Sequence, residues 1–90
     1  GRGGRHAARE YLQPLIDYDT RTNGELLHTL RTYLRLDARQ HATAVALHVH
    51  RNTLRYRLSQ ISRLLETDLD SLDTLVSCNL AFRMYDAAGR

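Results

Sequence analysis

The sequence predicts an all-α protein, a compact bundle of about five helices. Apolar residues recur along most of the chain at spacings of three and four, which is the period of one face of a helix. No stretch alternates apolar and polar residues as a half-buried strand does. The chain has only one proline and five glycines in 90 residues, so interruptions are rare. Its length is that of one domain, whose small core would benefit from a partner subunit.

The sequence at the start of the chain predicts a tail followed by a short first helix. Glycine-rich residues 1–4 predict a flexible tail, followed by one domain over residues 5–90. Apolar spacing predicts a first helix over residues 5–12, and Pro14 predicts its end because proline lacks the backbone donor and clashes with the preceding turn. A turn or a short helix is expected after Pro14. Residues 17–24 predict a loop, since they end in the turn signal Asn-Gly.

Two helices are predicted next, over residues 25–36 and 40–47. The first carries an apolar stripe at helical spacing, formed by Leu26, Leu27, Leu30, Tyr33 and Leu34. The second is short and rich in small residues, which permits close approach to a neighbouring helix. His48 and Val49 then form a tight connection.

Residues 51–65 predict a fourth helix with two different faces. Leu54, Leu58, Ile61 and Leu65 share one face. The opposite face consists of Asn52, Tyr56, Ser59 and Arg63. A fifth helix is predicted over residues 71–85, with Ser71 or Asp70 as its N-cap.

Charge is distributed unevenly along the chain. Thirteen arginines, no lysine and ten acidic residues leave a formal net charge of +3. Residues 39–63 hold five arginines, three histidines and no acid, whereas residues 64–90 hold two arginines and five acids. A surface without carboxylates favours a polyanionic partner. A solvated helix face that happens to lack acids would explain the same pattern.

Other function classes find no support in the sequence. No apolar run approaches the roughly 20 residues of a transmembrane helix, and a single cysteine suits a reducing cytoplasm. We expect no enzymatic activity and no cofactor, because paired catalytic acids, a Ser-His-Asp set and a glycine-rich phosphate loop are all missing. The histidines of residues 41–50 lack further ligands for zinc, and the aspartates of residues 68–73 lack the glycine and glutamate of a calcium loop.

The predicted helices over residues 40–47 and 51–65, joined by three residues, form a helix-turn-helix pattern. The apolar face of the second helix would hold it rigid, and its first two turns would present donors to a DNA major groove. Arg51 and Arg55 in those turns are unfavourable for the helix dipole unless an anion binds there. The pattern therefore favours a phosphate-bearing partner.

Residues 42–65, ATAVALHVHRNTLRYRLSQISRLL, resemble the C-terminal helix-turn-helix of the PucR/CdaR family of bacterial transcription regulators. The string ALHVHRNTLRYRL is its most specific part, and weaker flanking resemblance extends the coverage to residues 12–84. The element is also similar to the DNA-binding end of the nucleoid protein Fis. The resemblance implies sequence-specific binding of double-stranded DNA at the cytoplasmic nucleoid, as a homodimer, with a sensory domain upstream. One departure is Ala38-Arg39, where the family usually has Gly-Asn.

The helix-turn-helix pattern and the resemblance together define the predicted site. Base or groove contacts are expected from Arg51, Asn52, Arg55 and Tyr56. DNA-backbone contacts are expected from Arg39, Gln40, His41, Thr43, His50, Thr53 and Arg57. One alternative is a helical protein-interaction or dimerisation module without specific DNA binding. Another is an RNA-binding domain, which would offer more exposed aromatic side chains than Tyr56.

Overall fold

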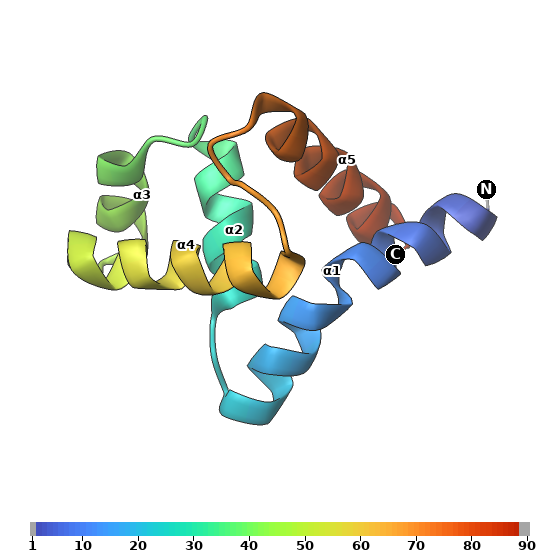
Figure 1. Ribbon diagram of the computed structural model, residues 1–90, viewed down its shortest axis with the longest axis horizontal. Coiled ribbons are helices and arrows are strands. Elements are labelled where there is room, and N and C mark those ends of the chain that lie inside the picture. The colour runs from blue at the N-terminus through green and yellow to red at the C-terminus, as the bar shows by residue number, and fades with distance from the viewer. Residues whose placement is uncertain (1, 89–90) are drawn as a thin grey trace.

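The computed structural model describes residues 2–88, with side chains from residue 7 onward. Its five helices are α1 (Arg2–Thr22), α2 (Leu26–Arg35), α3 (Gln40–Leu47), α4 (Arg51–Leu65) and α5 (Leu72–Ala88). Figure 1 shows α1 and α5 packed at one end of the molecule, α3 and α4 at the other, and α2 between them. The all-α prediction is confirmed, and α3 and α4 have the predicted bounds.

The predicted helix break at Pro14 is wrong, because α1 runs through this proline to Thr22. Leu12 and Leu15, on either side of it, have no exposed surface. Burying two leucine side chains contributes about 3–6 kcal/mol. An interior proline costs about 3 kcal/mol, so packing on both sides of Pro14 is sufficient to keep the helix continuous.

Two neighbouring segments also differ from the sequence prediction. Residues 2–4, expected in a flexible tail, form the first turn of α1, while Gly1 lies outside the described residues. Residues 17–22, expected in a loop, form the last turns of the same helix. Only residues 23–25 connect α1 to α2.

Asp19 caps α2 from the last turns of α1. Its carboxylate accepts hydrogen bonds from the backbone N–H groups of Leu26 (2.8 Å) and Leu27 (2.9 Å). Glu25, which directly precedes α2, makes no such side-chain cap. Gly24 suits this close approach, since a Cβ there would lie 3.0 Å from Oδ1 of Asp19. This cap needs Asp19 on a helix, which favours helical structure where local sequence predicts a loop.

Specific contacts tie α5 to α1 and α2. Nη1 of Arg31 donates to both carboxylate oxygens of Asp86 at 2.6 Å, and the same guanidinium lies 4.8 Å from the ring centroid of Phe82. The Tyr11 hydroxyl lies 3.6 Å from Sγ of buried Cys78. Burial, together with this hydrogen bond, raises the pKa of Tyr11 to about 12. These contacts fix the scaffold that supports α3 and α4.

Ser71, one of the two predicted N-caps, caps the start of α5. Oγ of Ser71 accepts from the N–H of Thr74 at 3.5 Å. Asp70 makes a different local bond, donating its own N–H to Oδ1 of Asp68 at 2.9 Å. Ser71 therefore supplies the cap, and α5 extends three residues beyond the predicted end at Tyr85.

Replacing Asp19 by alanine should lower the free energy of unfolding by about 1–2 kcal/mol, because two N–H groups of α2 lose their acceptor. Denaturant titration followed by far-UV circular dichroism measures this loss. Asp17→Ala is the matched control, since exposed Asp17 only accepts a bond from Gln13 at 2.8 Å. It should change stability by less than about 0.5 kcal/mol. Equal losses in both variants would contradict the capping role of Asp19.

Candidate nucleic-acid interface

A tight turn joins α3 to α4. His48 ends α3 in the left-handed region, with φ 57° and ψ 42°. The N–H groups of His48 and Val49 donate to the carbonyls of Val45 (3.1 Å) and Ala44 (3.0 Å), which satisfies the end of the helix. Because the chain turns at His48, only three residues separate the end of α3 from the start of α4.

His50 caps α4. Its Nδ1 accepts a hydrogen bond from the N–H of Asn52 at 3.0 Å. In neutral imidazole one ring nitrogen accepts and the other carries the proton, so the proton lies on Nε2. The exposed His50 ring thus has an N–H donor available beside the first residues of α4.

The two faces of α4 are as predicted. Leu54 and Ile61 have no exposed surface and Leu58 is 7% exposed, so this face is held in the core. On the opposite face Tyr56 is 63% exposed. All of the residues predicted to contact bases or the groove are exposed: Arg51, Asn52, Arg55 and Tyr56.

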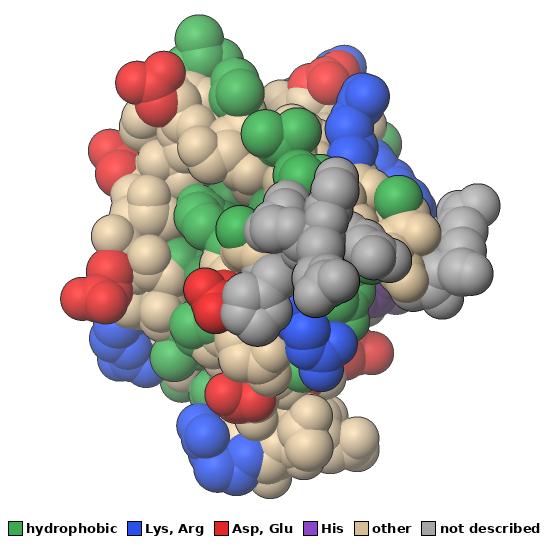
Figure 2. All heavy atoms as spheres, turned by 90° about the vertical axis from the view of Figure 1, so that its right-hand side faces the viewer, with side chains coloured by type: hydrophobic (Ala, Val, Ile, Leu, Met, Phe, Trp, Pro, Cys, Tyr) green, Lys and Arg blue, Asp and Glu red, His purple; other side chains and the backbone are tan. Residues whose placement is uncertain are grey.

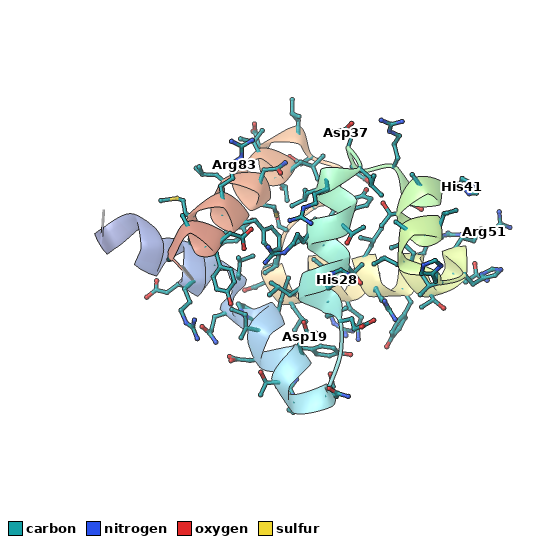
Figure 3. The ribbon with its side chains drawn as sticks, turned by 180° about the vertical axis from the view of Figure 1, so that it is seen from behind. Asp19, His28, Asp37, His41, Arg51 and Arg83 are labelled. Atoms are coloured by element: carbon teal, nitrogen blue, oxygen red, sulfur yellow. The ribbon has the colours of Figure 1, made fainter. Side chains whose placement is uncertain are left out.

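Five of the residues predicted to contact the DNA backbone are also exposed, namely Arg39, Gln40, His41, His50 and Thr53. They flank the starts of α3 and α4. Figure 3 shows His41 of α3 and Arg51 of α4 at the same edge of the molecule. Arg39 forms an ion pair with Asp37 at 3.2 Å, but the two side chains are 73% and 78% exposed. Such a surface pair is weak, so Arg39 remains available to a partner.

The structure buries two of the side chains predicted to contact the DNA backbone, one wholly and one in part. Thr43 has no exposed surface, and its hydroxyl donates to the carbonyl of Arg39 at 2.7 Å. Arg57 is 23% exposed, lies 3.6 Å from the Glu25 carboxylate and donates to the Thr29 hydroxyl at 3.3 Å. Sequence alone did not reveal that these side chains face the neighbouring helices. We therefore remove both from the candidate interface.

A groove of about 520 Å³ borders the exposed face of α4. Asn52 and Arg55 line it from α4, while Asp68 and Asp70 line it from the connection to α5. Burial, and secondarily the charge of Asp70, raises the pKa of Tyr33 in the same groove. The basic surface is thus bounded on this side by carboxylates, which repel phosphate.

Gln60 is a further polar residue in this region that the sequence did not single out. It is 7% exposed and bonds to both Tyr56 and Arg63 on α4. The only sequence signal is its position four residues after Tyr56, which makes the two side chains neighbours on a helix.

A short helix, a three-residue turn and a second helix with one buried face and one exposed basic face define a helix-turn-helix domain. This is a class of DNA-binding domains. In the part of the chain that the structure describes, no three potential metal ligands gather into a site. None of the helices described there has the length and hydropathy needed to cross a membrane.

Comparison with known families identifies the particular kind of helix-turn-helix. The family model of the PucR C-terminal helix-turn-helix domain matches residues 26–84, from the first residue of α2 to near the end of α5. The chain belongs to this family, whose members are bacterial DNA-binding transcription regulators.

Three relatives illustrate the relationship. The carbohydrate diacid regulator of Escherichia coli (strain K12) is 38% identical over 78 residues, covering 86% of this chain and 20% of that protein. The purine catabolism regulatory protein of Bacillus subtilis (strain 168) is 44% identical, covering 66% of this chain and 11% of that protein. The DNA-binding transcriptional activator AdeR of the same organism is 32% identical, covering 69% and 15%. The chain thus spans a fifth or less of these relatives, and no solved structure matches it.

Ala38 lies in the connection between α2 and α3 and has an unfavourable backbone conformation. Its φ is 60°, in the left-handed region, and its N–H donates to the carbonyl of Tyr33 at 2.8 Å. A residue with a Cβ costs about 1–2 kcal/mol there, whereas glycine does not. The resemblance to the family placed glycine at this position, so the chain keeps the turn that glycine favours without having the glycine.

Replacing Ala38 by glycine should therefore raise the free energy of unfolding by about 0.5–1 kcal/mol, after allowing for the greater entropy of glycine in the unfolded chain. Denaturant titration measures the gain. The control is Ala46→Gly, at an exposed position inside α3, which should lower stability by about 1 kcal/mol. If Ala38→Gly destabilises the protein as much as Ala46→Gly does, the left-handed conformation of Ala38 is contradicted.

Proposed function

We propose that this chain binds double-stranded DNA in a sequence-specific manner, with α4 as the recognition helix in the major groove. One observation carries the proposal. The exposed face at the start of α4 holds Arg51, Asn52, Arg55 and Tyr56 on a helix whose other face is fixed in the core. A major groove about 12 Å wide admits such a helix.

The residue types on this face suit base recognition. The planar guanidinium of Arg51 or Arg55 can donate two hydrogen bonds to O6 and N7 of guanine. The amide of Asn52 can pair with N6 and N7 of adenine in the same way. Because α4 is held by buried Leu54 and Ile61, these side chains start from a fixed backbone position. Rigid placement supports selection of particular bases rather than attraction to any duplex.

Contacts to the DNA backbone would come from the exposed residues that flank the recognition helix: Arg39, Gln40, His41, His50 and Thr53. Free N–H groups and the positive ends of the dipoles of α3 and α4 favour phosphate at the same place. Such contacts fix the register of the protein on the duplex but select no sequence themselves.

We further propose that the chain acts as a homodimer through the outer face of α5. Leu72, Val76 and Leu80 are 74%, 57% and 57% exposed, and their spacing of four places them on one face. Figure 2 views the molecule from the side of α5 and shows hydrophobic side chains at the surface among charged ones. Exposed apolar side chains that share one helix face, rather than lying scattered, support a protein partner.

Charge complementarity favours a second copy of the chain as that partner. Asp73 lies near the start of α5, and Arg83, labelled in Figure 3, lies near its end. Asp73, Val76, Leu80 and Arg83 follow one another at spacings of three and four, so they form one stripe. Two copies of α5 packed antiparallel about a two-fold axis would place Asp73 against Arg83 and Val76 against Leu80. Helix-turn-helix dimers use such symmetry to bind two half-sites.

In the longer protein, this domain would act as the DNA-binding part of a transcription regulator at the cytoplasmic nucleoid. The matched relatives are at least several times longer than the chain, which supports a separate upstream part that senses an effector.

Selection from a random duplex pool tests the proposed function. The chain should enrich one sequence and bind it at least about a thousandfold more tightly than a random duplex, with affinity falling steeply as salt rises. Fluorescence anisotropy at two salt concentrations measures both effects. No enrichment would favour a protein-interaction module, and equal or tighter binding of single strands would favour an RNA-binding domain.

Arg51→Ala and Arg55→Ala should each weaken binding to the selected duplex by about 1–3 kcal/mol and relax selectivity at one base position. Anisotropy gives the affinity, and repeated selection with each variant gives the base preference. Arg9→Ala is the matched control, because Arg9 is an exposed arginine of α1 outside the interface. Wild-type affinity in Arg51→Ala would show that the register of α4 on DNA is wrong.

The proposed dimer predicts a charge-swap result. Asp73→Arg and Arg83→Asp should each weaken self-association, because like charges would then face each other. The double variant should restore it, since the swap recreates both opposite-charge pairs. Sedimentation equilibrium over a range of protein concentrations measures the association constant, with exposed Ser77→Asp as a control beside the stripe. A wild-type chain that stays monomeric, or single variants that associate normally, would contradict this interface.

A further inference from the structure

We propose that Gln60 is a positioning residue that fixes the Tyr56 hydroxyl as a hydrogen-bond donor toward DNA. The proposal rests on the DNA-binding function proposed above. It states that Tyr56 is the donor in its hydrogen bond with DNA. Tyr56 would then bind a hydrogen-bond acceptor, either a phosphate oxygen or an acceptor atom on a base edge.

Three side chains along α4 form a hydrogen-bonded row. Nη2 of Arg63 donates to Oε1 of Gln60, and Nε2 of Gln60 donates to the Tyr56 hydroxyl at 3.1 Å. Gln60 is 7% exposed, whereas Tyr56 is 63% exposed. The buried amide therefore lies between an arginine and an exposed phenol. Both of its polar groups have partners on the same helix.

The chemistry of Arg63 sets the orientation of the Gln60 amide. A guanidinium only donates hydrogen bonds, so the amide atom that faces it must be the carbonyl oxygen. The amide NH₂ group then has to face Tyr56 and donate to its oxygen. A phenol hydroxyl that accepts in this way still has its own proton to donate. That proton is directed away from Gln60.

The position of Tyr56 makes this direction relevant to binding. The side chain borders two grooves, one shared with Asn52 and Arg55 and the other with Thr53. DNA presents phosphate oxygens along its backbone and acceptors on guanine, adenine and thymine in the major groove. A hydroxyl already set as a donor suits these groups.

A double-variant cycle tests the proposal, using the 90-residue chain and the duplex that it selects. Gln60→Glu keeps an acceptor for Arg63 but presents a second acceptor to Tyr56, so the hydroxyl proton should turn inward. Tyr56→Phe should weaken binding about three- to tenfold. Gln60→Glu should weaken binding at least about threefold more in the wild-type chain than in a chain that already carries Tyr56→Phe. The added charge acts in both backgrounds and cancels in this comparison.

The random-sequence duplex distinguishes the two kinds of acceptor. If Tyr56→Phe weakens binding to the selected and random duplexes equally, the acceptor is a phosphate oxygen. If the loss is confined to the selected duplex, it is a base edge. Equal effects of Gln60→Glu in both backgrounds would overturn the positioning role and leave Gln60 a purely structural residue.

A measurement without DNA separates failure of this proposal from failure of the proposed function. In the free protein, Tyr56→Phe should shift the side-chain amide resonances of Gln60 in ¹⁵N–¹H spectra, because the amide loses its acceptor. Unchanged resonances would overturn the hydrogen bond itself. Shifted resonances in a chain that binds no duplex would instead overturn the DNA-binding function and, with it, the contact. If Gln60→Glu fails to fold, Gln60→Met takes its place in the cycle. Gln60→Met should then weaken binding more in the wild-type chain than in the Tyr56→Phe chain, by a smaller factor than Gln60→Glu would.

Discussion

Burial of one face of α4 is the constraint on which the rest of the structure depends. Leu54 and Ile61 have no exposed surface, and α4 packs against α1, α2 and α3. Side chains leave a helix at fixed angles, so fixing these two residues fixes the direction of every other one. Arg51 and Arg55 are exposed for this reason. An interface whose backbone is already ordered loses less entropy when it binds, which leaves more of the contact energy for affinity.

The connections between helices are short because the chain turns through left-handed residues. Non-glycine residues with positive φ follow α1, α2, α3 and α4: they are Asn23, Asp37, Ala38, His48 and Glu66. A residue with a Cβ costs about 1–2 kcal/mol in this conformation. Such conformations persist where the surrounding packing determines them. Here that packing is the core shared by α2, α3 and α4, and the turn at His48 brings α4 back against α3 within three residues.

The bounds of α3 and α4 were predictable from sequence because their apolar period and the intervening turn are local features. The continuity of α1 could not be predicted from sequence. It depends on the burial of Leu12 and Leu15 and on the capping of α2 by Asp19, which are contacts beyond the local segment. The same limit applies to the candidate site. Helical periodicity separates the buried face of α4 from the exposed one, but it does not show that α2 lies beside Arg57. The hydrogen-bonded row from Arg63 through Gln60 to Tyr56 could be recognised only from the positions of the side chains.

Arg51 and Arg57 show why net charge alone overstates the basic surface. Both lie on α4 in the segment without acids, yet Arg51 is exposed while Arg57 pairs with Glu25 and donates to Thr29. Two aspartates after α4 border the exposed face of this helix on another side. Within residues 39–63, three exposed arginines thus lie at the starts of α3 and α4: Arg39, Arg51 and Arg55. Non-specific affinity grows with the number of phosphates neutralised, whereas base recognition depends on the geometry of a few donors. In the proposed complex, a small cationic surface on a rigid helix would limit non-specific affinity and would give base contacts a larger share of the total binding energy.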